Sequence, residues 1–434
     1  MVRKLLSGLL RGGWLALLAG LLTSPAAWAQ PAGPAPGPFV FSRARQQQAR
    51  LSFFTQRNLI IVSAKLNGVG PLNFLLDTGV STCLLTNPAV ADSLHLTHGT
   101  TYRVNGVGGT DAGISAYEAT DVAVTMDGGV VAPHLNWLVL SHDVLDLSGY
   151  VGMPIHGLIG ADFFRSFVVT IQPEVFKLVL HDPATYRAPK GKRWATLPLH
   201  LAQGKAYVTA EVRQLAPGGG SVLPLRLVLD TGAGHALSLE TTADRRLRLP
   251  PANLRTDLGR GLTGVISGAL GRVAAVRLGR YQLPQVLTSF PDSTQVHERL
   301  SATERQYRQG NLGYEVLKRF VCVIDYPHQR LLLRPNSTLH EPFEHDMSGL
   351  DLMATGTNYR RLLVQRVLPG SPAEEAGIEP EEELMSINFM PVTAYTISEV
   401  NHLLHSEDGR LLVLMLRRRN GNMHPAAVRL KRQI

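Results

Sequence analysis

The stretch Phe74-Leu-Leu-Asp-Thr-Gly-Val-Ser81 occurs a second time as Leu227-Val-Leu-Asp-Thr-Gly-Ala-Gly234. Each copy is a short apolar run, typical of a buried strand, that leads directly into an Asp-Thr-Gly turn. A second matching motif ends 83 residues after each aspartate, as Gly157-Leu-Ile-Gly160 and Gly310-Asn-Leu-Gly313. The constant offset of 153 residues between the two halves indicates an internal duplication, in which each copy is a small domain.

The two aspartates of the repeat, Asp77 and Asp230, occupy equivalent turns. If the two halves pack about a pseudo-two-fold axis, these carboxylates face each other. Two like charges at close range cannot both ionise cheaply, so the pair shares one proton. A half-protonated pair can take a proton from water and give one to a carbonyl oxygen, which is general acid–base hydrolysis of an amide.

The paired motifs over residues 55–335 resemble those of the aspartic peptidases, the retroviral and pepsin-like group. The resemblance implies a mainly β fold of two duplicated retropepsin-like β-barrel lobes, with Asp77 and Asp230 as the catalytic pair. It also implies supporting residues in both turns: Thr78 and Thr231 would hydrogen-bond across the lobe interface, and Gly79 and Gly232 would let the backbone approach the site. No metal and no cofactor are implied. Val80 departs from the family, which favours Ser, Thr or Ala after the glycine.

Glycine-rich segments lie at equivalent places in the two halves. They contain Gly106, Gly108 and Gly109 in the first half and Gly264 and Gly268 in the second. On glycines alone a plain β-turn is the favoured interpretation. Their matched placement predicts instead the pair of hairpins, or flaps, that in the resembled family close over the substrate.

The first residues of the chain have the pattern of an export signal. Arg3 and Lys4 precede an apolar run, and Ala27-Trp-Ala29 fits a small-x-small cleavage site. A membrane anchor is the alternative, but the interrupted run is short for a spanning helix. We therefore expect a signal peptide at residues 1–29, a periplasmic or secreted location, and no transmembrane segment in the mature chain. A Pro/Gly-rich tether is expected at residues 30–50.

The remaining chain divides into three expected domains: a first lobe at 51–187, a second lobe at 188–342 and a C-terminal domain at 345–434. The segment Val367-Leu-Pro-Gly-Ser-Pro-Ala-Glu-Glu-Ala-Gly-Ile378 resembles a bacterial PDZ domain. Capping boxes begin at Ser371 and Thr396. The resemblance implies docking of a C-terminal peptide by strand addition. The acidic Glu381-Glu-Glu383 turn and the loop at Gly349-Leu350 depart from the family and slightly favour mere packing against the lobes. We nevertheless predict docking, because strand addition relies on backbone groups that these side-chain departures do not remove.

The charge, cysteine and histidine patterns argue against a nucleic-acid-binding protein, a disulfide bond and a zinc protease. The formal net charge is +9, but the basic residues are scattered and Arg417-Arg-Arg419 is the only run of three, so no nucleic-acid partner is expected. Cys83 and Cys322 lie at non-equivalent places in apolar surroundings, which favours two buried thiols over a disulfide. The histidines of His340-Glu-Pro-Phe-Glu-His345 are five apart, and Pro342 prevents the helix that a zinc-protease motif needs.

These observations predict an exported aspartic endopeptidase that hydrolyses polypeptides. Because one chain carries both Asp-Thr-Gly turns, we expect an active monomer. A non-catalytic peptide-binding protein on the same scaffold is the alternative from another class, although a binding module has no need of both carboxylates. An enzyme that cuts a non-protein amide in the cell envelope is a third possibility. The substrate and its cleavage preference are not encoded in any motif.

Overall fold

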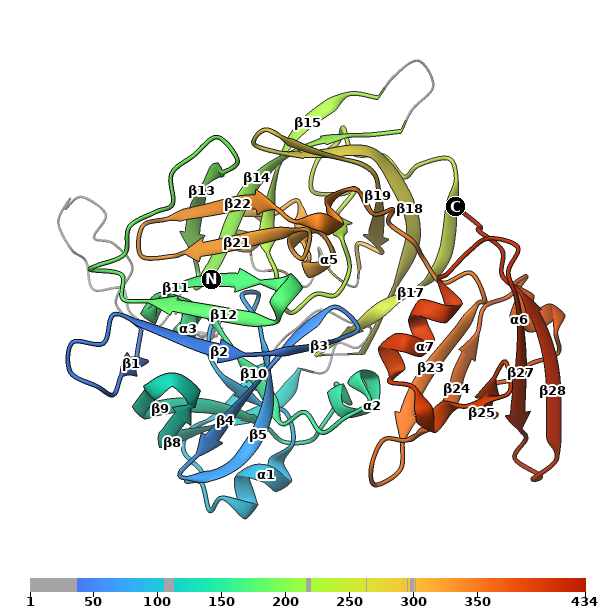
Figure 1. Cartoon of the computed structure of the whole chain (residues 1–434), viewed down its shortest axis with the longest axis horizontal. Coiled ribbons are helices and arrows are strands. Elements are labelled where there is room, and N and C mark those ends of the chain that lie inside the picture. The colour runs from blue at the N-terminus through green and yellow to red at the C-terminus, as the bar shows by residue number, and fades with distance from the viewer. Residues whose placement is uncertain are drawn as a thin grey trace, which may run out of the picture. The chain divides into compact units, whose positions relative to one another are not determined.

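The computed structural model describes residues 37–104, 113–215, 220–262, 264–294, 296, 300 and 302–434. The first lobe is a mainly β unit (Figure 1). Its elements are β1 (Val40–Phe41), β2 (Gln48–Ser52), β3 (Phe54–Gln56), β4 (Leu59–Leu66), β5 (Val69–Leu76), β6 (Leu84–Leu85), α1 (Pro88–Ser93), β7 (Thr101–Val104), β8 (Ile114–Met126), β9 (Val130–Leu140), α2 (Leu147–Val151), β10 (Gly157–Ile159), α3 (Ala161–Ser166), β11 (Val168–Gln172) and β12 (Lys177–His181).

The second lobe repeats this order of strands. Its elements are β13 (Ala195–Ala202), β14 (Lys205–Arg213), β15 (Val222–Leu229), β16 (Leu237–Leu239), β17 (Asn253–Gly261), β18 (Gly264–Leu278), β19 (Tyr281–Pro291), α4 (Ala302–Tyr307), β20 (Gly310–Leu312), α5 (Tyr314–Leu317), β21 (Phe320–Asp325) and β22 (Arg330–Pro335).

Each lobe closes its sheet into a barrel. In the first lobe the neighbours run β9-β6-β10-β5-β4-β8, and β8 pairs back with β9. In the second lobe they run β19-β16-β20-β15-β14-β18, and β18 pairs back with β19. The order is the same once equivalent strands are matched. The duplication predicted from the 153-residue offset is therefore a duplication of a closed sheet, which leaves few free strand edges.

The motif strands are apolar because other chain segments cover them. Phe74, Leu75 and Leu76 at the end of β5 are all buried, and so are the residues of β10 beside them. β10 runs parallel to β5, with Gly157 opposite Phe74 and Ile159 opposite Leu76. Such continuous apolar runs are typical of parallel strands covered on both faces. The aspartate follows at the carboxyl end of the buried strand, where the chain turns.

A shared sheet joins the two lobes. Its neighbours run β13-β22-β21-β11-β12-β2, and the lobes meet where β11 pairs antiparallel with β21. In this pairing Thr170 lies opposite Val323, and these two positions are equivalent in the repeat. The pseudo-two-fold axis therefore passes through this pair. One apolar core runs through both lobes, so they form a single body.

The expected tether at 30–50 ends earlier than predicted. Gly37 and Phe39 already pack on the first lobe: Phe39 is 2% exposed, its ring contacts Phe163, and its N–H donates to Ser166 Oγ over 3.0 Å. β1 pairs with β9, and β2 pairs with β12. The prediction was wrong for the described part, residues 37–50, because the Pro/Gly composition of the preceding residues hid the strand pattern that follows. The predicted signal peptide at 1–29 lies outside the described residues.

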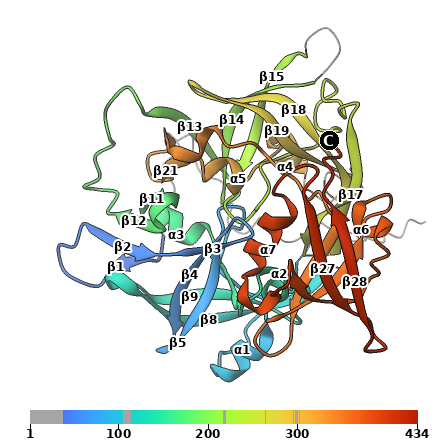
Figure 2. The same ribbon diagram turned by 45° about the vertical axis from the view of Figure 1, so that its right-hand side comes forward.

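A smaller sheet forms the C-terminal domain, drawn in orange and red (Figure 2). Its elements are β23 (Leu350–Thr355), β24 (Arg361–Val367), α6 (Pro372–Glu375), β25 (Glu383–Ile387), β26 (Met390–Pro391), α7 (Ile397–Leu404), β27 (Leu411–Arg417) and β28 (Met423–Arg429). The strand order is β23-β24-β25-β27-β28, so β23 is an edge strand. The domain has its own apolar core, on which α7 packs through Ile397, Val400 and Leu404.

Of the two capping boxes predicted in this domain, one is confirmed and the other is half formed. The capping box at Thr396 is complete, because Thr396 Oγ1 accepts from Glu399 N–H and Glu399 accepts from Thr396 N–H. The box at Ser371 is half formed: Ser371 Oγ accepts from Glu374 N–H, whereas the Glu374 carboxylate accepts from Gly370 N–H instead.

In the two lobes, Cys83 and Cys322 are free, buried thiols, as predicted.

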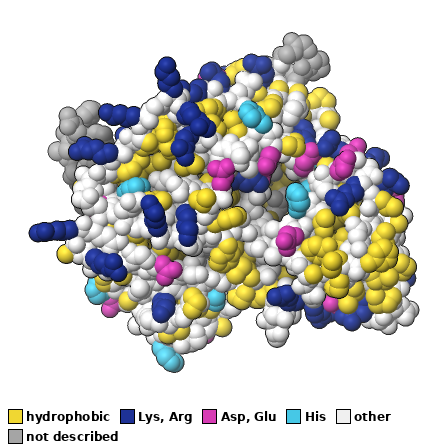
Figure 3. All heavy atoms as spheres, in the orientation of Figure 1, with side chains coloured by type: hydrophobic (Ala, Val, Ile, Leu, Met, Phe, Trp, Pro, Cys, Tyr) yellow, Lys and Arg dark blue, Asp and Glu magenta, His cyan; other side chains and the backbone are white. Residues whose placement is uncertain are grey.

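The distribution of basic side chains on the surface is as the sequence led us to expect. Lys and Arg side chains are spread over the face in Figure 3 rather than gathered into one patch. Within the described ranges, no helix is long and apolar enough to cross a bilayer.

Candidate active site

The two Asp-Thr-Gly turns are held by equivalent backbone contacts. Asp77 N–H donates to the carbonyl of Ile159 over 2.9 Å, and Asp230 N–H donates to the carbonyl of Leu312 over 3.0 Å. Each acceptor ends the parallel strand beside the motif strand, β10 in the first lobe and β20 in the second. The second motif of each half therefore fixes where the aspartate leaves its strand.

The threonines of the two turns cross the lobe interface, as the resemblance implied. Thr78 Oγ1 donates to the carbonyl of Leu229 over 2.6 Å, and Thr231 Oγ1 donates to the carbonyl of Leu76 over 2.8 Å. Each hydroxyl also accepts the partner's amide: Thr231 N–H reaches Thr78 Oγ1 over 2.9 Å, and Thr78 N–H reaches Thr231 Oγ1 over 3.0 Å. Both side chains are fully buried, so the lobes are locked together directly beneath the aspartates.

The carboxylates of Asp77 and Asp230 meet above these threonines. A Cβ placed on Gly79 would lie 3.0 Å from Asp77 Oδ1 and 3.0 Å from Asp230 Oδ1, so both carboxylates surround one point. A Cβ on Gly232 would lie 2.2 Å from Asp77 Cγ. Any side chain at Gly232 would therefore collide with Asp77 of the opposite lobe, and a side chain at Gly79 would make tight contacts with both carboxylates.

The proximity of the two carboxylates changes the acidity of Asp77. Burial is the larger cause and the charge of Asp230 the second; together they raise the pKa of Asp77 from 3.8 to about 7. Hydrogen bonds from the backbone of Gly79 and Gly232 and the charge of Lys205 oppose this shift in pKa. The arrangement can keep one proton on the pair near neutral pH, which is the state that general acid–base chemistry needs.

Three further residues surround the pair and were not found in the sequence. His235 is buried beside Asp230, and burial lowers the pKa of its imidazole. Tyr326 is buried near both aspartates, and burial followed by the charge of Asp77 raises the pKa of its phenol. Lys205 lies near Asp77 and forms an ion pair with Glu304 over 2.7 Å. None carries a local motif, because each reaches the site only through the packing of distant segments.

Asn311 also contacts the pair. Its Nδ2 donates to Asp230 Oδ2 over 2.6 Å. Asn311 belongs to the second motif of its half, where the first half has Leu158. The sequence pattern classed this position as apolar, so its polar contact was missed. The difference between the two copies of the motif was the available signal.

In each lobe a hairpin turn packs against the Asp-Thr-Gly turn of the other lobe. A Cβ on Gly234 would lie 2.4 Å from the carbonyl oxygen of Arg57, in the turn between β3 and β4. A Cβ on Gly204, in the turn between β13 and β14, would lie 2.7 Å from the Cβ of Ser81. Gly234 and Ser81 are equivalent in the repeat. Each Asp-Thr-Gly turn is therefore buttressed by the other lobe.

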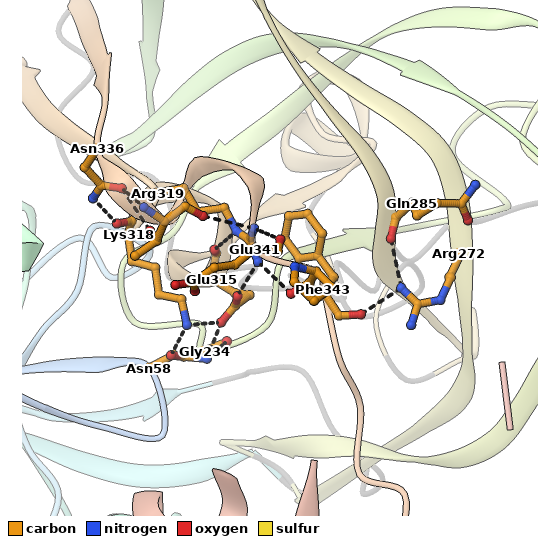
Figure 4. A network of polar contacts seen from close by, with 12 residues as sticks. Asn58, Gly234, Arg272, Gln285, Glu315, Lys318, Arg319, Asn336, Glu341 and Phe343 are labelled. Carbon is orange, nitrogen blue, oxygen red and sulfur yellow. Dashed lines mark hydrogen bonds and ion pairs between the residues drawn. The ribbon is translucent and has the colours of Figure 1, made fainter. Parts of the chain in front are cut away.

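A polar network extends from one of these turns toward the C-terminal domain (Figure 4). Asn58 Nδ2 donates to Glu315 Oε2 over 2.6 Å, and Glu315 pairs with Lys318 over 2.6 Å and with Arg319 over 2.9 Å. The Arg319 guanidinium is fully buried and lies 3.6 Å from the centre of the Phe343 ring. It also donates to the carbonyls of Glu341 and Pro342, which belong to the segment that leaves the second lobe.

The predicted flap residues are placed differently from one another. Gly106, Gly108 and Gly109 lie outside the described residues. Gly264 lies at the tip of the β17–β18 hairpin, opposite Gly261, with a φ of +131°. Gly268 lies inside β18, where a Cβ would be 2.3 Å from the carbonyl oxygen of Phe290. Gly268 is therefore needed for close packing on β19 and is not part of the hairpin tip. A flap role for Gly264 stays a prediction.

The C-terminal domain is in contact with both lobes. Arg57 of the first lobe donates through Nη2 to the carbonyl of Leu352 on the edge strand β23, over 2.6 Å, and its N–H donates to Ser398 Oγ on α7, over 2.8 Å. Arg366 on β24 donates to Thr256 Oγ1 over 2.9 Å and pairs with Asp257 over 3.3 Å. Both of these second-lobe residues lie on β17. The domain thus contacts a buttressing turn and the hairpin that carries the flap candidate Gly264.

Across the part of the chain that the structure describes, no group of three or more His, Cys, Asp and Glu side chains could hold a metal ion.

Models of known protein families match the two lobes and the C-terminal domain. The family model described as aspartyl protease matches twice, over residues 62–163 and 209–316, and the model described as PDZ domain matches residues 363–418. A search of curated proteins found no significant match. Both lobes therefore match the aspartyl protease family model, as two retropepsin-like repeats in one chain, and the C-terminal domain matches the PDZ model.

Among solved structures, an aspartic proteinase from Irpex lacteus is 15% identical, with a TM-score of 0.42. The match covers 67% of this chain and 98% of that one. A photosystem II D1 C-terminal processing protease is 20% identical over 20% of this chain and 23% of that one, with a TM-score of 0.19. The predicted fold class, a mainly β body of two duplicated lobes plus a PDZ domain, is confirmed by the family matches and the strand order.

Proposed function

We propose that the protein is an exported aspartic endopeptidase that hydrolyses polypeptides through a water molecule activated between Asp77 and Asp230. The observation that carries this proposal is the meeting of the two carboxylates around one point, with each glycine turn facing the opposite aspartate. The raised pKa of Asp77 supports it, because a shared proton is what the reaction consumes and returns.

The proposed reaction balances its protons within the pair. The ionised carboxylate takes a proton from water while the oxygen of that water attacks the scissile carbonyl carbon. The protonated carboxyl gives its proton to the carbonyl oxygen, which produces a neutral gem-diol. In the second step the newly protonated carboxyl gives its proton to the amide nitrogen as the C–N bond breaks. The other carboxylate takes a proton from the diol, and the pair returns to its starting state.

The test is hydrolysis of a peptide library by purified protein, with and without pepstatin. Asp77→Asn and Asp230→Asn should each lower kcat by about 10²–10⁴-fold, because neither carboxylate can perform both transfers alone. The double variant should be scarcely worse than either single variant, since the groups act as a unit. Asp121→Asn is a matched control, because the Asp121 side chain is 72% exposed.

Three results would oppose the proposal. An Asp230→Asn enzyme that keeps most of its turnover would exclude the two-lobe mechanism. Wild-type protein that binds library peptides but cleaves none would favour the non-catalytic alternative. Hydrolysis of non-protein amides alone would instead favour an enzyme that cuts such an amide in the cell envelope.

Export is part of the proposal and rests on the pattern of residues 1–29. Expression in a bacterial host, followed by fractionation and N-terminal sequencing, should yield a mature chain that begins near Gln30. A chain recovered with its first residues intact in the cytoplasm would contradict this.

We further propose that the PDZ domain docks a substrate segment by strand addition to β23, in competition with Arg57. Strand addition needs free backbone groups on an edge strand. Arg57 already bonds the carbonyl of Leu352 on that edge. In the loop before β23, the N–H groups of Ser348 and Gly349 donate to the Asp346 carboxylate. The amides that would hold a peptide's terminal carboxylate are therefore engaged by the domain itself, which favours docking through the strand edge.

A further inference from the structure

The two aspartates differ in their side-chain contacts although their backbone contacts match. Asp230 Oδ2 accepts a hydrogen bond from the Asn311 amide, whereas Asp77 Oδ1 accepts from the backbone of Gly79. The first lobe has Leu158 at the place of Asn311. Leu158 is buried in an apolar cluster with Leu75 and cannot donate a hydrogen bond. The two aspartates therefore have matching backbone hydrogen bonds but different hydrogen-bond donors to their carboxylates.

The residue that follows each glycine does not supply a matching donor. Val80 and Ala233 have no hydroxyl or amide in their side chains. The donor to Asp230 comes instead from β20, the strand beside its own motif strand. The position is fixed, because Asn311 lies opposite Val228 on one side and Ser238 on the other.

The orientation of the Asn311 amide follows from its surroundings. Its Oδ1 is buried and has no hydrogen-bond partner among the described residues. Leaving a buried acceptor unsatisfied is costly. The bond from Nδ2 to Asp230 is thus the polar contact that holds the Asn311 amide. A group that donates a hydrogen bond in this way favours the ionised form of its acceptor.

Other titratable and charged groups face the pair from each packed element. His235 follows the second turn, Tyr326 follows β21, and Lys205 begins β14. Burial lowers the pKa of His235 and raises that of Tyr326, so both side chains are neutral at neutral pH. The Lys205 ammonium is paired with Glu304. Among the residues that the structure describes, Asn311 is the side chain that donates a hydrogen bond to Asp230.

We propose that Asn311 is a positioning residue that assigns the two roles in the pair, holding the negative charge on Asp230 and leaving the shared proton on Asp77. This inference rests on the function proposed above. In the first step Asp230 then takes the proton from water, and Asp77 gives its proton to the carbonyl oxygen. In the second step Asp230 gives that proton to the leaving nitrogen, and Asp77 regains one from the diol. Atoms and charges balance as before, but each transfer now has a named residue.

The test is the pH profile of kcat/KM for Asn311→Leu, which installs the residue that the first lobe has. Loss of the donor should move the acidic limb of the profile upward by about one pH unit, because an ionised carboxylate loses a stabilising hydrogen bond. The alkaline limb should stay in place. Thermal unfolding monitors folding, since a purely structural role would change stability without moving one limb of the profile.

A reciprocal variant strengthens the test. Leu158→Asn combined with Asn311→Leu moves the amide to the first lobe. The acidic limb should then return toward its wild-type position, because the charge can be held on Asp77 instead. The apolar surroundings of Leu158 make this variant the less stable one, so the single Asn311→Leu variant decides the question by itself.

Two outcomes overturn the inference. The first is a folded Asn311→Leu enzyme whose acidic limb does not move. The second is a downward move of the alkaline limb, which would mean that Asp230 carries the proton and Asn311 accepts it. The proposed function is tested separately: if Asp77→Asn and Asp230→Asn are inactive and Asn311→Leu has an unmoved profile, only the assignment of roles fails. If the aspartate variants remain active, the proposed function fails first.

Discussion

At the scale of single residues, Asp77 couples folding to pH. Its folded pKa is raised from 3.8 to about 7, chiefly by burial. As pH rises from about 4, the unfolded chain releases this proton while the folded chain still holds it. The folded state therefore binds more protons over this range, and its stability falls as pH rises until about pH 7.

We predict that Asp77→Asn flattens this dependence. The wild-type free energy of unfolding should decrease between about pH 4 and pH 7, at most on the order of 1.4 kcal/mol for each pH unit from this group. In the Asn variant that part of the slope disappears, because the amide does not titrate. Chemical denaturation at several pH values measures the slope. An unchanged slope in the variant would contradict the prediction.

Thr78 stabilises the folded protein through hydrogen bonds that cross the lobe interface. Its hydroxyl satisfies two buried backbone groups of the other lobe, the carbonyl of Leu229 and the N–H of Thr231. Thr78→Val keeps the shape but leaves both groups without a partner, at about 1–3 kcal/mol each. We expect the free energy of unfolding to fall by about 2–6 kcal/mol in total. Thr78→Ser keeps the hydroxyl and is the matched control; equal losses in the two variants would point to packing instead.

At the scale of elements, the β17–β18 hairpin is held at its side by the PDZ domain. Arg366 on β24 bonds Thr256 and Asp257 on β17, and Ser267 on β18 donates to the same Asp257 over 3.0 Å. A hairpin that closes over substrate has to open and close, so a contact near its middle limits how far it can move.

Arg366→Ala should therefore loosen this hairpin. We expect faster hydrogen exchange of the amides in residues 253–261 and a KM for a short peptide raised by about two- to tenfold, with the pair's pH profile unchanged. Arg361→Ala is the matched control, because Arg361 lies on the same strand but pairs with Glu383 inside the domain. Equal exchange in the two variants would show that the contact does not restrain the hairpin.

At the scale of the whole molecule, Arg57 connects strand β23 and helix α7 of the PDZ domain to the second Asp-Thr-Gly turn. Its side chain and backbone bridge β23 and α7, while its carbonyl oxygen packs on Gly234, two residues after the second Asp-Thr-Gly turn. Its guanidinium also lies 4.4 Å from the centre of the Tyr150 ring. A peptide added to β23 would have to displace this side chain, so docking and the buttressing of the catalytic turn are coupled.

We predict that Arg57→Ala exposes the edge of β23. In an Asp230→Asn background, which prevents cleavage, binding of decapeptides to the variant should tighten by about tenfold, since the competing hydrogen bonds are gone. Fluorescence anisotropy measures this affinity, and Arg43→Ala is the control for loss of an exposed arginine. Unchanged affinity would leave the domain a packing module that holds the lobes.

Assembly gives a second prediction at this scale. The cross-lobe threonine bonds and the β11–β21 pairing join two turns of one chain. The specific activity should therefore not depend on enzyme concentration. Loss of activity on dilution, together with a change in mass by light scattering, would show that a second chain completes the site.

The sequence by itself determined the duplication, the two aspartates and the family of both parts. These depend on local patterns: an apolar strand that ends in Asp-Thr-Gly, repeated with one spacing, needs no knowledge of distant contacts. Sequence patterns did not predict that Asn311 bonds Asp230, that Arg57 bonds β23 and α7 of the PDZ domain, or that residues 37–50 join the first lobe; these contacts came from the tertiary structure. Each of these joins segments far apart in the chain. Such contacts are selected by the closing of the barrels and the shared core, which no local pattern records.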